Sequence, residues 1–91
     1  PVDSDIMNFI VPSEVEILGE NSLRECNKIT ELTLPDDLQS IESYAFYGMD
    51  NLKLVHYKGN EYTEYKDLEK ALKENGVKYN YSVELKDTGL K

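Results

Sequence analysis

The side chains that could support catalysis or hold a metal ion are few and scattered along this chain. His56 is the only histidine and Cys26 is the only cysteine among the 91 residues. A proton relay or a histidine-based metal site needs further partners of this kind. The chain also lacks a Gly-x-Ser-x-Gly elbow and a Gly-rich phosphate loop. Asp36 and Asp37 follow Pro35, where aspartate commonly bonds its own backbone in a turn. We therefore expect no catalysis, no cofactor and no metal ion.

Both single residues have a structural interpretation. A lone cysteine cannot form an internal disulfide, and Cys26 lies 23 positions before the apolar Met49. This predicts a buried and inert thiol. His56 lies between Val55 and Tyr57, and we expect it to face solvent from a strand.

The elements that position these residues follow from an apolar series that occurs twice, 23 positions apart. Pro12 stands 23 positions before Pro35. The second copy contains Leu38, Ile41, Ala45, Phe46, Met49, Leu52, Val55 and Tyr57, and the first contains Val15, Leu18, Ser22, Leu23, Cys26, Ile29, Leu32 and Leu34. Each copy has an apolar face that it cannot bury alone, so this internal repeat predicts stacked units.

Each unit should contribute a strand to the stack. We predict strands over Asp5–Val11, Ile29–Leu34 and Leu52–Tyr57, and the first two end at prolines, which cannot donate a ladder hydrogen bond. Ile6, Phe9 and Val11 fall 23 positions before Ile29, Leu32 and Leu34, as in the second half of a preceding unit. Val15 and Leu18 should point inward from a short extended segment.

The chain after residue 57 departs from the repeat. Lys58-Gly59-Asn60 predicts a turn, and Tyr65, Leu68, Ala71 and Leu72 share one face of a helix expected at residues 63–75. Thr63 is the expected N-cap, and Asn75-Gly76 is the expected stop. Apolar residues then alternate with polar ones over residues 77–85, as in a strand, at Val77, Tyr79, Tyr81, Val83 and Leu85.

These elements predict one domain over residues 1–91, an α/β-type repeat solenoid of about two and a half 23-residue units. The repeat stack should cover residues 5–57. A C-terminal cap, the helix and strand at residues 58–85, should close it, and residues 86–91 should form a flexible tail.

Charge is concentrated in the repeat half. Residues 1–60 contain 11 acidic and 4 basic side chains, a net charge of 4 − 11 = −7, whereas residues 61–91 contain 7 acidic and 6 basic, a net charge of 6 − 7 = −1. An acidic body repels phosphate backbones and anionic membrane surfaces, so we expect no nucleic-acid partner. No apolar run approaches the roughly 18 residues that would cross a bilayer, so we expect no membrane insertion.

The repeat resembles a known family over residues 6–57. The segments IESYAF and LPDDLQSI of the second copy are similar to the BspA-type leucine-rich repeat, although Ser22-Leu23 replaces the usual Ala-Phe in the first copy and Met49 replaces a cysteine. The resemblance implies a terminal cap after the repeats. It also implies that the chain is a repeat region of a larger microbial protein at the cell surface or secreted. Many proteins with such repeats come from gut or oral bacteria. Such proteins act in adhesion or host contact.

The outward side chains of the expected sheet are the candidate partner-binding residues. The 23-residue offset places Asn8, Glu31 and Leu54 in one row and Ile10, Thr33 and His56 in another. This face either contacts a protein or glycan partner or is simply the exposed face of a small sheet. The tyrosines at positions 57, 62, 65, 79 and 81 either form a second contact surface or fasten the cap to the stack.

Two functions remain open. The chain is either a binding module whose sheet face contacts a partner or a structural module in which residues 58–85 terminate a larger repeat protein. The strand over Asp5–Val11 should leave an exposed edge, so we also expect self-association there unless residues 1–4 cover it.

Overall fold

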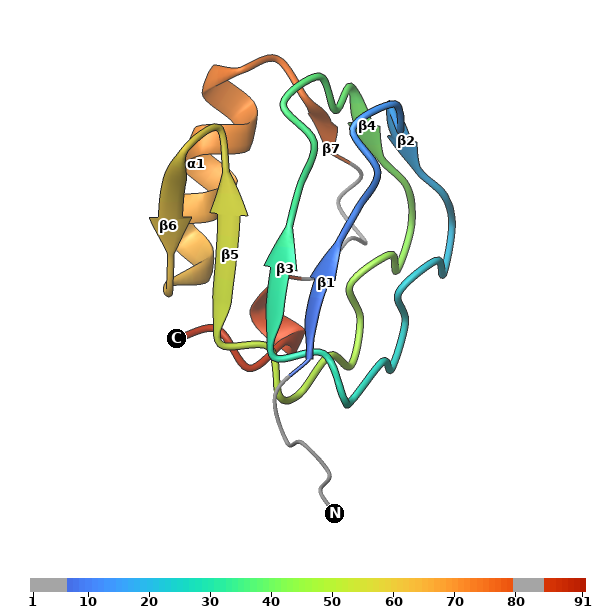
Figure 1. Cartoon of the computed structure of the whole chain (residues 1–91), viewed down its shortest axis with the longest axis vertical. Helices are drawn as coiled ribbons and strands as arrows, with labels where there is room; N and C mark the ends of the chain where they lie inside the picture. The colour runs from blue at the N-terminus through green and yellow to red at the C-terminus, as the bar shows by residue number, and fades with distance from the viewer. Residues whose placement is uncertain (1–6, 80–84) are drawn as a thin grey trace.

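The computed structural model describes residues 7–79 and 85–91 (Figure 1). Within those ranges the chain forms short strands, one α-helix and one 3₁₀ helix. Their bounds are β1 Asn8–Ile10, β2 Ile17–Leu18, β3 Glu31–Thr33, β4 Ser40–Ile41, β5 Leu54–Tyr57, β6 Asn60–Tyr62, α1 Tyr65–Glu74, β7 Lys78–Tyr79 and η1 Leu85–Asp87.

The described strands form two sheets, and the parallel pairs β1–β3, β3–β5 and β2–β4 keep the 23-residue offset, whereas β4 and β7 pair Ser40 with Lys78. One sheet has the order β1-β3-β5-β6, and its first three strands are parallel, with Phe9 beside Leu32 and Leu32 beside Val55. The other has the order β2-β4-β7 and is parallel throughout, with Leu18 beside Ile41. The repeat inferred from the apolar series is therefore confirmed by the pairing of its strands, and the chain has a repeat fold.

The buried apolar residues of the described chain form one core between the two sheets, and Figure 1 shows β2, β4 and β7 above and to the right of β1, β3 and β5. The repeat positions supply most of it, and Phe46 and Met49 are completely buried. Burying one such side chain stabilises the fold by about 1.5–3 kcal/mol. Cys26 is half-buried and packs against this core rather than lying fully inside it.

The two turn segments, residues 19–26 and 42–49, stack directly on each other. The N–H of Leu23 donates to the carbonyl of Ala45 at 3.0 Å, and that of Glu25 donates to Tyr47 at 2.7 Å. Left-handed backbone recurs at the same repeat position, at Asn21 (φ 62°) and 23 residues later at Tyr44 (φ 59°). Each unit thus repeats its backbone path as well as its apolar pattern.

The helix is shorter at its start than the sequence indicates. It spans Tyr65–Glu74, and Glu64 is the N-cap, without a side-chain capping bond, so the assignment of Thr63 as the N-cap is wrong. The carbonyl of Thr63 instead accepts a bond from the N–H of Lys91. The predicted stop is confirmed, because Asn75 is the C-cap and Gly76 adopts φ +75°.

The prediction of a flexible tail at residues 86–91 is wrong. Leu85 and Leu90 are buried, and the tail bonds to the second turn segment through Gly48 N–H to Asp87 O (3.1 Å) and Gly89 N–H to Met49 O (3.0 Å). The first of these bonds corresponds to the one from Glu25 to Tyr47 in the preceding unit. Residues 85–91 therefore take the place that the turn segment of a further unit would occupy.

The remaining differences concern strand length. In the described part of the chain, the predicted strands are shortened to β1, β3, β5 and β7. Leu85 begins η1 rather than ending a strand. Asp5, Ile6 and residues 80–84, with Tyr81 and Val83 among them, lie outside the described residues. Phe9 belongs to the inner row of the repeat but is 38% exposed, because β1 is the outermost described strand of its sheet.

Candidate partner-binding face

The six predicted contact residues lie together on the sheet formed by β1, β3 and β5. Glu31 pairs with Asn8 on one side and Leu54 on the other, and Thr33 pairs in the same way with Ile10 and His56. Between these rows the side chains of Leu32 and Val55 are completely buried, so the alternating residues face away from the core. Asn8 and Ile10 are exposed, and the other four are half-buried. We name this surface the sheet face.

Strand β6 extends the sheet face by one acidic residue that sequence reasoning missed. It pairs antiparallel with β5 and brings Glu61 opposite His56. The two-residue turn between them has positive φ at both Lys58 (51°) and Gly59 (80°), as in the I′ turns that join tight hairpins. The sequence contained a signal for this hairpin. Lys58-Gly59 favours a tight turn, and Tyr62, two residues after Asn60, lies on the core side.

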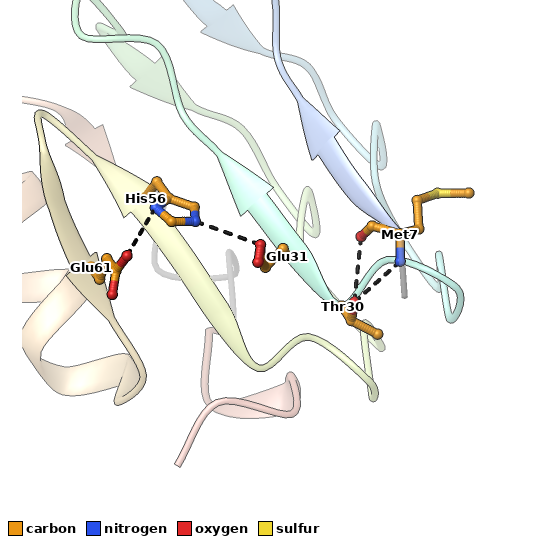
Figure 2. Close-up of polar contacts among 5 residues, drawn as sticks. All are labelled: Met7, Thr30, Glu31, His56 and Glu61. Carbon is orange, nitrogen blue, oxygen red and sulfur yellow. Dashed lines mark hydrogen bonds and ion pairs between the residues drawn. The ribbon is translucent and has the colours of Figure 1, made fainter. Parts of the chain in front are cut away.

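His56 lies between two carboxylates (Figure 2). Its Nε2 is 3.7 Å from Oε2 of Glu31, and its Nδ1 is 3.7 Å from Oε2 of Glu61. The side chains of His56 and Glu31 are 31% and 29% exposed, whereas that of Glu61 is 66% exposed. His56 is thus only partly exposed to solvent, and its ring separates the two acidic side chains on the sheet.

The lower end of the sheet face in Figure 2 is fixed by a contact between adjacent units. The N–H of Met7 donates to Oγ1 of Thr30 at 3.2 Å, and the Thr30 hydroxyl can donate to the Met7 carbonyl at 3.5 Å. The backbone N–H of Thr30 also donates to the Met7 carbonyl at 3.0 Å. These residues are 23 positions apart, so the contact holds β1 in register with β3 just before the first residue of each strand.

The tyrosines near the C-terminal end pack inward. Tyr57 is buried, and Tyr62, Tyr65 and Tyr79 are partly buried against the core. The hydroxyl of Tyr79 donates to Oε2 of Glu69 at 3.1 Å, which ties β7 to α1. The structure therefore supports the packing interpretation for these four rings, and Tyr81 lies outside the described residues.

Tyr57 has an unusual environment for a hydroxyl. Its oxygen is buried and has no hydrogen-bond partner in the described part of the chain. Burial raises the pKa of Tyr57 above its ordinary value of 10.0, and the nearby Tyr62 and Asp36 raise it further because their negative charges oppose ionisation. The neutral phenol is therefore the form that the fold accommodates.

Residues 7–79 and 85–91 hold neither a candidate metal site nor a membrane-spanning helix. In these ranges no group of three or more histidine, cysteine, aspartate or glutamate side chains is placed to hold a metal ion. The single α-helix found there is too short and too polar to cross a membrane.

Parallel strands paired at a fixed 23-residue offset around one core define a repeat protein. A family model described as BspA type leucine rich repeat region (6 copies) matches residues 3–71. This chain belongs to the BspA-type leucine-rich repeat family. The match extends past the expected limit at residue 57 and into α1. No curated protein and no solved structure matches the chain significantly.

Proposed function

We propose that this chain is a non-catalytic binding module whose sheet face contacts a protein or glycan partner. The observation that carries the proposal is the in-register display of the six face residues, with the core residues of the same strands confined to the other side. A rigid sheet that holds side chains at fixed spacing is a suitable platform for recognition.

The family supports the wider setting of this proposal. BspA-type leucine-rich repeats are generally non-enzymatic and typically belong to surface or secreted proteins. We propose that this chain is a terminal region of a microbial surface or secreted protein that acts in adhesion or host contact. We also propose that its two sheets are the two sides of a short solenoid of about two and a half units.

Selection from a random-peptide display library, together with an immobilised glycan panel, tests the binding function. We expect selected ligands to bind more weakly to Glu31→Ala and to His56→Ala while both variants keep the parent melting temperature. Glu20→Ala is the matched control, because Glu20 is exposed on the first turn segment. Ligands that bind both face variants as they bind the parent would show that the face assignment is wrong.

A second candidate function is that residues 58–91 terminate the stack and have no ligand of their own. The distribution of exposed apolar side chains favours it. Met7, Phe9, Ile10 and Ile17 are exposed at the first unit, whereas Leu68, Leu72, Leu85 and Leu90 are buried at the opposite end. Removal of residues 61–91 should then cause aggregation and loss of a cooperative thermal transition. A soluble remainder that still melts cooperatively would count against the cap.

We propose further that copies of the chain associate through this exposed first unit. Ile17 on β2 is 60% exposed and Ile10 on β1 is 63% exposed, and both strands are outermost among the described strands of their sheets. Sedimentation velocity at several concentrations should show a concentration-dependent increase in mass. The mass of a monomer at every concentration would rule out association through the first unit.

A further inference from the structure

We propose that the partner of the sheet face is a cationic protein segment, which carries a lysine or arginine for Glu31 and Glu61 and an apolar side chain for Ile10. This rests on the proposed binding function and specifies the partner's chemistry. It favours a protein over a neutral or anionic glycan.

The first argument is the shortage of donors around the two carboxylates. In its neutral form an imidazole has one N–H, so at least one of Glu31 and Glu61 faces a nitrogen lone pair at 3.7 Å. In its protonated form it supplies one positive charge to two negative ones. The group of three therefore keeps a net negative charge in either state, and an incoming ammonium or guanidinium group supplies the missing donors and charge.

The second argument is the absence of competing cations. Within residues 7–79 and 85–91, no lysine or arginine forms an ion pair with Glu31 or Glu61, and the ion pair that Arg24 makes is with Glu25, on the first turn segment. The repeat half of the chain has a net charge of 4 − 11 = −7. A basic segment is therefore attracted to this half as a whole, and anionic ligands are repelled.

The third argument is the geometry of one row of the sheet face. Ile10, Thr33, His56 and Glu61 are paired across four adjacent strands, so the row runs from an exposed apolar residue to an acidic one over about 14 Å. An extended peptide covers about 13 Å in four residues and places those two side chains on the same side. The partner thus has an apolar and a basic residue about four positions apart.

NMR titration of the ¹⁵N-labelled chain tests this with short serine-rich peptides. The first probe peptide has a valine and a lysine about four positions apart, and two others replace the lysine by glutamine or glutamate. We expect the lysine peptide to bind about five-fold more tightly than the glutamine peptide, as two partly exposed ion pairs allow. The lysine peptide should cause its largest chemical-shift changes at the amides of Thr33, His56 and Glu61. High salt should remove the preference for the lysine peptide over the glutamine peptide.

Two double variants complete the design. Glu31→Gln with Glu61→Gln should bind the lysine and glutamine peptides equally, and Glu20→Gln with Glu42→Gln should keep the five-fold preference. Glu20 and Glu42 are exposed acidic residues outside the sheet face. Equal binding of the lysine and glutamine peptides to the parent, or no shifts on the sheet face at millimolar lysine peptide, would overturn the inference. The binding function itself fails only if the library and glycan ligands are also insensitive to the face variants.

Discussion

Gly89→Ala tests whether the last residues are an integral part of the fold. An alanine Cβ at this position would lie 2.6 Å from the carbonyl oxygen of Leu52 and would also clash with the carbonyl of Asp50. Ordinary contact begins at 3.4 Å, so the segment must move away by at least 3.4 − 2.6 = 0.8 Å. Both obstacles are backbone atoms, which cannot rotate aside as a flexible side chain would.

The expected cost has two parts. Forcing a methyl group into a filled site typically costs about 1–3 kcal/mol. Weakening the bond from Gly89 N–H to Met49 O adds about 0.5–1.5 kcal/mol. A total of about 3 kcal/mol is a large part of the roughly 5–14 kcal/mol expected for a domain of this size, and it corresponds to a fall in melting temperature of about 12–24 °C.

Thermal and urea denaturation followed by circular dichroism measure this effect. Gly19→Ala is the matched control, because its Cβ meets nothing within 4 Å and its backbone is not left-handed. We expect Gly19→Ala to melt close to the parent. If Gly89→Ala has the same melting temperature as Gly19→Ala, residues 85–91 are not packed against Asp50 and Leu52. The sequence-based expectation of a flexible tail would then be right.

The other predictions concern the core and the turn segments. Tyr57→Phe should be neutral or stabilising by up to about 1 kcal/mol in urea denaturation, because it removes a buried hydroxyl without a partner in the described chain; marked destabilisation would reveal a missed partner. The pKa of Tyr57 is raised in the folded state, so the unfolded chain releases the phenol proton first as the pH rises. The contribution of the neutral phenol to the free energy of unfolding is therefore complete below about pH 10 and is lost above it. Tyr57→Phe should therefore flatten the alkaline fall in stability, and an unchanged slope would contradict this. Arg24→Ala should cost about 1 kcal/mol, because the guanidinium lies 5.3 Å and 5.1 Å from the ring centres of Tyr44 and Tyr47 and joins the two turn segments; no change would mean that the contact does not persist in solution. Phe46→Ala should cost about 3–5 kcal/mol in the same assay, and a smaller loss would mean that the core collapses around the cavity.

The repeat could be predicted from the sequence because its signal is long-range and redundant. A period of 23 residues shared by many apolar positions fixes which residues lie side by side, whatever the local propensity. The pairing of Glu31 with Leu54 and of Thr33 with His56 followed from that offset alone. The rows of the sheet face are therefore the part of the candidate site that the sequence could supply.

The C-terminal part could not be predicted in the same way, because it follows no period. Leu85 and Leu90 are separated by polar residues, and their burial depends on tertiary bonds to Gly48 and Met49 that no local pattern reveals. The N-cap was misplaced for a similar reason, since the backbone of Thr63 bonds to Lys91, at the far end of the chain. Glu61 was missed because the hairpin that places it opposite His56 lies outside the repeat.

The register of the parallel strands is the claim on which both the face and its partner depend. Interstrand nuclear Overhauser effects in the ¹³C,¹⁵N-labelled chain measure it directly. We expect a parallel pattern that connects Leu32 with Phe9 on one side and with Val55 on the other. A shift of one residue would exchange the two faces of a strand and turn Glu31 toward the core, so an antiparallel or shifted pattern would contradict the account.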